Sequence, residues 1–283
     1  MTFHIIEGGV TAAKGFQASG IHCGIRKNRS KADLALIYSD VPCAAAAVYT
    51  QNLVKGAPIA VTKRNIADGT ARAVICNSGN ANTCNADGEE KAQKMCDLIA
   101  AELHIDASDV IVASTGVIGQ VLPIEPIANS VKTLAEALSA TGSNDAAKAI
   151  MTTDTVEKEY ALEVELDGKT VTVGGITKGS GMIHPNMATM LGFLTTDAAI
   201  TSELLNEALH TAIEDTFNMV SVDGDTSTND MVSVMASGLA ENQTITEKNH
   251  DYELFTQALT EVCAVLSRKI AKDGEGATRL LEC

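Results

Sequence analysis

The spacing of apolar residues changes from segment to segment and predicts strands alternating with helices. Arg72 to Cys76 and Val110 to Ala113 are short apolar runs typical of buried strands. Between them, Glu89 to Leu103 carries an apolar residue every three or four positions, which predicts an amphipathic helix. This order of strand, helix and strand favours an α/β or α+β fold.

The second half of the chain continues the alternation. Leu162 to Ile176 alternates between apolar and polar residues around Asp167-Gly168, a strong hairpin signal. Met190 to Leu194 is apolar enough for a central strand. Glu203 to Phe217 and Tyr252 to Lys272 each place their apolar residues on one helical face. These patterns predict a hairpin, a strand and two long helices.

Composition limits the class of protein. The 283 residues are 45% apolar, which is enough for a large core, and we expect a single domain spanning 1–283. The net charge of −15 would repel DNA or RNA, so nucleic-acid partners are not expected. The N-terminus has no signal-peptide pattern and no apolar run is long enough for a membrane span. A cytoplasmic protein without membrane partners is therefore expected.

Cysteine usage agrees with a reducing compartment. The seven cysteines are odd in number and none has C-x-x-C spacing, so we interpret them as reduced thiols. The less favoured alternative is a metal site built from Cys84, Cys96 and a distant histidine. We therefore predict no metal ion and no cofactor.

The most unusual segment is KGSGMIHPNMATMLGFLTTD, from Lys178 to Asp197. Taken alone, its Gly-Ser-Gly is most often a loop after a hairpin, and no G-x-x-x-x-G-K-[ST] phosphate loop is present. A threonine that opens a strand, such as Thr189, is mostly a strand former, and His184 is more often a turn residue than a catalyst. Single residues therefore leave the chemistry open.

The contiguous run KGSGMIHPNMATML resembles the signature of the ornithine acetyltransferase family, also called bifunctional glutamate N-acetyltransferase. The resemblance extends over essentially the whole chain, because further segments agree in the same order. They are NSGNAN at 77–82, ASTGVIG at 113–119, MTTDT at 151–155, VDGDTSTND at 222–230 and DGEGAT at 273–278.

The resemblance implies a fold and a maturation step. The fold would be a layered α-β-β-α arrangement with mixed sheets, similar to N-terminal-nucleophile enzymes. The chain would cut itself between Ala188 and Thr189 into pieces 1–188 and 189–283, and two copies of each piece would assemble. Cleavage would leave Thr189 with a free α-amine whose pKa, about 7.7–8.0, lets it accept the proton of its own hydroxyl.

The resemblance also implies the reaction. Thr189 would take acetyl from N-acetylornithine and pass it to glutamate in a ping-pong sequence, giving ornithine and N-acetylglutamate in arginine biosynthesis. Whether acetyl-CoA is a second donor stays open, because no motif reports the depth of the pocket.

Further residue roles follow from the resemblance. Thr115 and Gly116 would stabilise the oxyanion, Lys178 and Thr152 would contact substrate together with Thr189, and Glu275 would pair with a substrate amine. From the residues alone, Thr115-Gly116 is a turn after a strand, Lys178 is solvated, Thr152 ends a helix and Glu275 lies in a turn.

The family pattern continues beyond DGEGAT into a segment with further substrate contacts, and the 283 residues end before it. We therefore expect self-cleavage, which needs only local geometry, to be retained more readily than efficient transfer, which needs a closed pocket. Two alternatives remain: a nucleophile-type amidohydrolase or aminopeptidase that gives the acyl group to water, and a catalytically silent chain that only binds or assembles.

Overall fold

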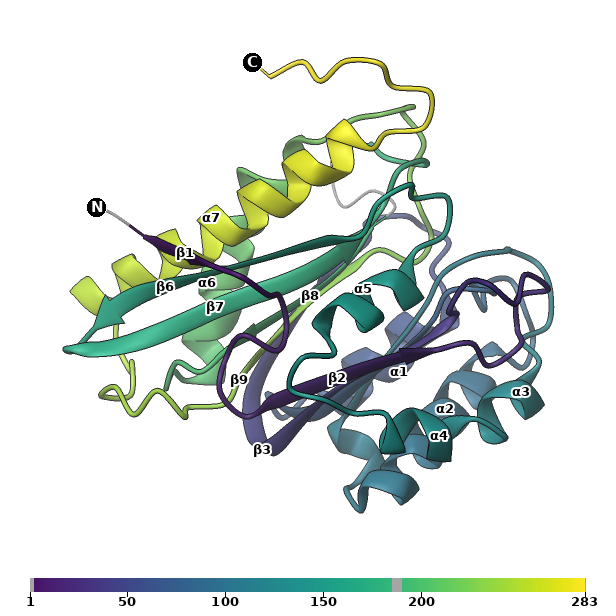
Figure 1. Cartoon of the computed structure of the whole chain (residues 1–283), viewed down its shortest axis with the longest axis horizontal. Coiled ribbons are helices and arrows are strands. Elements are labelled where there is room, and N and C mark those ends of the chain that lie inside the picture. Colours follow the sequence, from purple (N-terminus) through teal and green to yellow (C-terminus); the bar gives the residue numbers. More distant parts are fainter. Residues whose placement is uncertain (1–2, 185–189, 283) are drawn as a thin grey trace.

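Strands from distant parts of the chain join in one mixed sheet (Figure 1). The structure is a computed structural model that describes residues 3–184 and 190–282. Its strands are β1 (His4–Ile6), β2 (Phe16–Ile21), β3 (Leu34–Tyr49), β4 (Thr70–Asn77), β5 (Val110–Ser114), β6 (Lys158–Leu166), β7 (Lys169–Lys178), β8 (Leu191–Thr196) and β9 (Met231–Ala236). Within the described residues, the order across the sheet is β1-β6-β7-β8-β9-β3-β4-β5, and β2 pairs with β3.

The long strand β3 connects two halves of this sheet. Its first part pairs with β2 and β4, and its last part, from Ala44 to Tyr49, pairs with β9. The register with β4 shifts between Tyr38 and Cys43. Such an irregularity bends a strand and increases its twist. One half therefore contains β2, β4 and β5, and the other contains β1 and β6 to β9.

Alternating side chains show that the two halves face each other. On β4, Val74 belongs to the same buried cluster as Phe193 of β8, whereas its neighbour Ile75 packs on the opposite side. On β9, Met231 joins that shared inner cluster and Val232 points outward. Because successive strand residues point to opposite faces, each half has an inner face against the other half and an outer face.

Helices cover the outer faces. The helices are α1 (Ala57–Asn65), α2 (Gly88–Leu103), α3 (Ile124–Ala128), α4 (Val131–Glu136), α5 (Ser143–Ile150), α6 (Ser202–Glu214) and α7 (His250–Lys272), with 3₁₀ turns at Ala107–Asp109 and Phe217–Met219. Helix α5 is the exception, because its buried residues pack in the inner cluster and it contacts β2, β3 and β7. α6 and α7 pack on the half that contains β6 to β9 (Figure 1). On the other half, α2 packs on β5 and β4. The layers are α-β-β-α, so the α/β class and the predicted layering are confirmed.

The elements expected from periodicity are present with shifted ends. The predicted strand at 72–76 is β4, the helix at 89–103 is α2, and the helix at 252–272 is α7. The predicted hairpin is β6–β7, where Asp167 and Gly168 have φ of 51° and 68°. Two consecutive positive φ values are the requirement of a type I′ turn.

Candidate active site

A cavity of about 920 Å³ lies where segments from both halves of the sheet converge. Every predicted site residue that the structure describes lines it: Thr115, Gly116, Thr152, Lys178 and Glu275. The remaining two predicted residues, Ala188 and Thr189, lie outside the described residues. The fold thus brings together residues that are far apart in sequence, as expected of an active site.

Thr115 and Gly116 form a turn at the carboxyl end of β5, beside the end of β4. The Thr115 N–H donates to Asn77 O at 2.9 Å, which continues the parallel pairing of the two strands. Gly116 has φ of 124°, and a Cβ there would lie 2.6 Å from the carbonyl carbon of Gly79. Both the backbone angle and the close approach require glycine. The predicted turn after a strand is confirmed, and it faces the cavity.

Two buried asparagines hold this turn in place. Asn77 Oδ1 accepts hydrogen bonds from the N–H groups of Gly79 and Asn80 at 3.2 and 3.0 Å. Asn229 Nδ2 donates to Ala81 O at 2.6 Å and to Ser114 O at 2.9 Å. Buried amides with satisfied donors and acceptors make a loop rigid. The sequence contained both asparagines within its motifs, but the hydrogen bond of Asn229 to Ala81, 148 residues away, was not predictable from spacing.

Lys178 ends β7 as a buried cation. Its residue surface is 2% exposed, and its Nζ lies 3.5 Å from Thr115 Oγ1. No carboxylate of the described residues forms an ion pair with it within 4.0 Å. Burial lowers the pKa of Lys178, and the charge of Asp154 opposes that change. The interpretation of Lys178 as a solvated lysine was wrong, because β7 carries its side chain into the interior, where a buried cation favours an anionic ligand.

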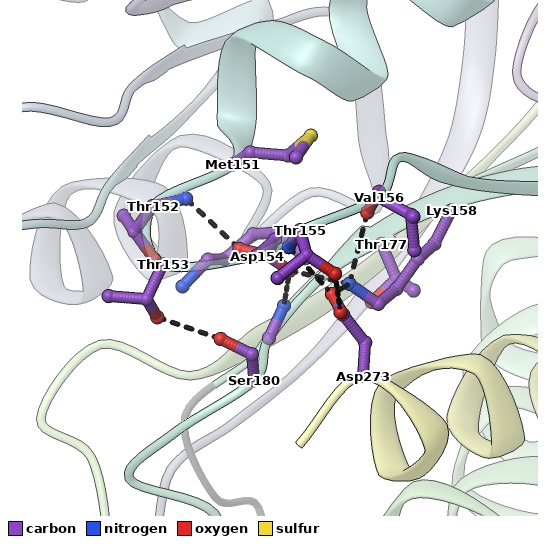
Figure 2. A network of polar contacts seen from close by, with 12 residues as sticks. Met151, Thr152, Thr153, Asp154, Thr155, Val156, Lys158, Thr177, Ser180 and Asp273 are labelled. Carbon is purple, nitrogen blue, oxygen red and sulfur yellow. Dashed lines mark hydrogen bonds and ion pairs between the residues drawn. The ribbon is translucent and has the colours of Figure 1, made fainter. Parts of the chain in front are cut away.

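Thr152 and Glu275 lie on two segments that meet Lys178 at the cavity. Thr152 follows the end of α5, and its N–H donates to Asp154 Oδ2 at 3.0 Å (Figure 2). The exposed Glu275 follows the end of α7, and its N–H donates to Ser180 O at 2.7 Å. The predictions of a helix-end residue and a turn residue are both confirmed, and both residues also line the cavity.

Described residues before and after the predicted cleavage position donate hydrogen bonds to the loop before β9. Asp223 accepts hydrogen bonds from the N–H groups of Met182 and Ile183. Asp230 Oδ1 accepts from Met190 N at 2.8 Å. Asp230 is completely buried, and burial raises its pKa well above the ordinary value, against the opposing effects of Met190 N–H, Ser227 and Lys178. The VDGDTSTND motif therefore has a structural role that its sequence alone did not reveal.

Sequence comparison decides the family. A sequence model described as the ArgJ family matches residues 17–283. The arginine biosynthesis bifunctional protein ArgJ of Symbiobacterium thermophilum is 52% identical over 279 residues, which cover 98% of this chain and 69% of that protein. The same-named protein of Bacillus subtilis is 50% identical over 279 residues, covering 98% and 68%. This chain belongs to the ArgJ family.

Solved structures agree with membership of the ArgJ family. The ArgJ crystal structure from Bacillus halodurans matches with a TM-score of 0.61 at 45% identity, covering 66% of this chain and 100% of that one. Ornithine acetyltransferase from Mycobacterium tuberculosis, solved with ornithine, has a TM-score of 0.60 at 37% identity, covering 65% and 98%. An L-aminopeptidase from Ochrobactrum anthropi, described as a variant of the Ntn hydrolase fold, shares only the fold: its TM-score is 0.56 at 13% identity, covering 100% and 94%.

The described residues also bear on metals, thiols and membranes. Among residues 3–184 and 190–282, no group of three or more His, Cys, Asp or Glu is arranged to hold a metal ion. The six described cysteines are free thiols, and burial raises the pKa of Cys76 to about 12. Within the described part of the chain, no helix combines the length and apolarity needed to cross a bilayer.

Proposed function

We propose that this ArgJ family chain is an acetyltransferase of arginine biosynthesis that moves acetyl from N-acetylornithine to glutamate through an acetyl ester on Thr189. The observation that carries the proposal is the convergence of Thr115, Gly116, Lys178 and Glu275 on one cavity. A rigid turn, a buried cation and a carboxylate are the groups that an acyl transfer between amino acids requires.

Maturation comes first in the proposed sequence. The Thr189 hydroxyl attacks the Ala188 carbonyl carbon, the C–N bond breaks, and the nitrogen takes a proton to become the Thr189 α-amine. Water then hydrolyses the ester and releases Ala188 as a carboxylate. The hydrogen bonds of Asp223 to Ile183 N–H and of Asp230 to Met190 N–H support this step, because they fix the chain on both sides of the bond to be cut.

The length of the crystallised relative supports cleavage as well. The B. halodurans ArgJ chain is covered completely yet matches only 66% of this chain, which is about 187 of 283 residues. A piece ending at Ala188 would have nearly this length. The proposed products are therefore 1–188 and 189–283.

Acetyl transfer uses the freed amine. The Thr189 amine accepts the hydroxyl proton while its oxygen attacks the acetyl carbonyl of N-acetylornithine, and ornithine leaves with that proton. The oxyanion lies against Thr115 and Gly116, where each donor contributes on the order of 3 kcal/mol. Glutamate then attacks the ester, giving N-acetylglutamate and the free hydroxyl.

Lys178, Thr152 and Glu275 bind the substrates in this scheme. The buried ammonium of Lys178 pairs with the substrate α-carboxylate, Thr152 lies beside it, and Glu275 pairs with an amine. The M. tuberculosis relative, crystallised with ornithine, supports an ornithine-type ligand. Acetyl-CoA is proposed as a second donor, with no resident cofactor or metal, and two copies of each piece as the assembly.

The central test is cleavage at Thr189. Purified protein is expected to give two species on a denaturing gel with the masses of 1–188 and 189–283, and Thr189→Ala is expected to give one, because the attacking oxygen is gone. Intact mass spectrometry after addition of N-acetylornithine should add one acetyl group to the smaller piece. An uncut parent chain with no acetylated species would contradict the proposal.

The second candidate function is hydrolysis, because the aminopeptidase from O. anthropi shares the fold. Ornithine release from N-acetylornithine is measured with and without glutamate. Transfer predicts release that rises with glutamate and is matched by N-acetylglutamate. Equal release without glutamate would favour the hydrolase.

A further inference from the structure

A completely buried lysine lies next to the candidate-site cavity but is not among the residues that line it. Lys158, the first residue of β6, is 0% exposed. Its Nζ donates to Asp154 Oδ1 at 2.7 Å, to Asp273 Oδ2 at 2.6 Å and to Val156 O at 3.2 Å (Figure 2). A buried ammonium is tolerated when it is fully paired. We call Lys158, Asp154 and Asp273 the Lys158 cluster.

The carboxylate of Asp154 holds the backbone around two substrate contacts. Its Oδ1 also accepts from Gly179 N at 2.7 Å, the residue after Lys178. Its Oδ2 accepts from Thr152 N at 3.0 Å. Burial would raise the pKa of Asp154, but Lys178, Lys158 and the Gly179 N–H together lower it, so the group is a carboxylate.

The carboxylate of Asp273 holds the third contact. Asp273 caps the end of α7, two residues before Glu275, and its side chain is 6% exposed. It accepts from Thr155 N at 3.0 Å and from the Thr155 hydroxyl, which ties the loop 151–155 to the end of α7. The cluster therefore joins a segment before the predicted cut to a segment after it.

Charge counting gives the cluster a second role. Two carboxylates and one ammonium carry a net charge of −1 next to Lys178. Burial disfavours the charged form of Lys178, and Lys158 adds to this effect, whereas Asp154 is the charge that most favours the ammonium; Glu275 lines the same cavity. Because Asp154 has the largest favourable effect on the ammonium, its loss should lower the pKa of Lys178 most.

We propose that Asp154 and Asp273, joined by Lys158, are positioning residues of the acetyl-transfer site: they hold Thr152, Lys178 and Glu275 around one ligand and supply the negative charge that keeps Lys178 an ammonium. This inference rests on the proposed function, in which Lys178 binds a carboxylate. A buried ion pair alone is weak support for such a role, since many are replaceable by apolar residues, so the test needs a readout that stability does not move.

The pH dependence of ornithine binding tests the charge. An ornithine carboxylate pairs with Lys178 only while the lysine is protonated, so affinity is present below its pKa and is lost as pH rises through it. Asp154→Asn should move this loss to lower pH by about one unit or more, the usual effect of one adjacent charge. Ornithine affinity is measured by calorimetry from pH 6 to 10 in the cleaved protein. Asp145→Asn, an exposed change on α5, is the control and should follow the parent.

Two substitutions of Asp273 test the positioning. Asp273→Asn keeps an oxygen for Lys158 and Thr155 N–H, whereas Asp273→Ala removes both acceptors. At pH 7 we expect the alanine variant to bind ornithine about tenfold more weakly, the effect of about 1.4 kcal/mol, and the asparagine variant to bind like the parent. At higher pH the asparagine variant should lose affinity earlier than the parent, because the cluster is then neutral.

The outcomes separate this inference from the function. A parent protein that produces no N-acetylglutamate contradicts the proposed function. The ornithine-binding measurements still test the role of the Lys158 cluster in that case. The charge role is overturned if the pH profile of ornithine affinity of Asp154→Asn superimposes on that of the parent. If Asp154→Asn does not fold, an unshifted pH profile of Asp273→Asn overturns the charge role instead. Equal affinity of Asp273→Ala and the parent at pH 7 overturns the positioning role.

Discussion

Gly116 is constrained twice, by its φ of 124° and by the backbone of Gly79. We predict that Gly116→Ala lowers kcat by about 10²-fold or more, because the added Cβ must displace the turn that holds the oxyanion donors. The KM for N-acetylornithine should change little, since Lys178 and Glu275 lie on other segments. Steady-state kinetics of the cleaved enzyme provide the measurement.

Gly119 offers a matched control for this substitution. It also has a positive φ, 78°, but a Cβ at this position would meet no atom within 4 Å. Gly119→Ala therefore introduces the backbone strain without the collision, and it should retain most of the activity. Equal losses of kcat in the two variants would show that backbone strain, rather than the collision with Gly79, accounts for the effect.

At the scale of single residues, the sequence predicted which residues form the candidate site but not what surrounds them. The motifs selected Thr115, Gly116, Thr152, Lys178 and Glu275, and all five line one cavity. Their surroundings were not predictable, because burial of Lys178 and the pairing of Lys158 with Asp273 depend on contacts between residues up to 115 positions apart. Local patterns report turns and periodicity, not which distant carboxylate reaches a lysine.

The elements were predictable where periodicity was strong. β4, α2, the β6–β7 hairpin, α6 and α7 all lie where the apolar spacing places them. The role of β3 was not predictable, because its two parts pair with different partners and only the register shift between Tyr38 and Cys43 shows the bend. Strand order likewise depends on long-range pairing, which a single sequence does not encode locally.

The parallel pair of β8 and β9 begins with a buried carboxyl that lacks full pairing. Asp230, just before β9, binds Met190 N–H through Oδ1, and its Oδ2 has no hydrogen-bond partner among the described residues. Burial raises the pKa of Asp230 in the folded protein. The folded state therefore holds a proton that the unfolded chain releases above its ordinary pKa, so stability falls as pH rises through that interval.

Asp230→Asn should remove this dependence, because the amide keeps an oxygen for Met190 and carries no charge. We predict that the free energy of unfolding of this variant is at least that of the parent at pH 7, with a gain of up to about 1 kcal/mol. The difference should grow as pH rises. Thermal unfolding followed by circular dichroism between pH 5.5 and 8.5 measures it, with Asp145→Asn as the exposed control. A variant less stable than the parent at pH 8.5 would contradict this account.

At the scale of the whole molecule, the predicted cut divides the sheet in an interleaved way. The piece 189–283 contains β8 and β9, which lie between β7 and β3 of the piece 1–188 (Figure 1). β7 pairs with β8 from Lys178↔Leu191 to Val173↔Thr196, and β3 pairs with β9 over six residues. Two central strands, rather than an edge, thus belong to the smaller piece.

Both pieces also share the buried clusters. Phe193, Met231 and Met235 pack in the inner cluster with Val74 and Ile111, so separation would expose a face of each half of the sheet. Apolar burial contributes about 25 cal/mol per Å², and such exposure is too unfavourable for the pieces to dissociate while folded. Cleavage should therefore leave the native fold unchanged.

We predict that the two pieces remain together through gel filtration and separate only in denaturant. The cleaved protein should elute as one species that gives two bands on a denaturing gel, and urea should unfold both pieces in a single transition, because β8 and β9 cannot leave without opening the sheet on both sides. The piece 189–283 produced alone should be largely unfolded by circular dichroism, since its strands lack β7 and β3 as neighbours. Thr189→Ala, which retains the covalent link, is the control and should give the same native elution volume. Recovery of a folded, monomeric 189–283 piece would contradict the interleaved arrangement as the basis of assembly.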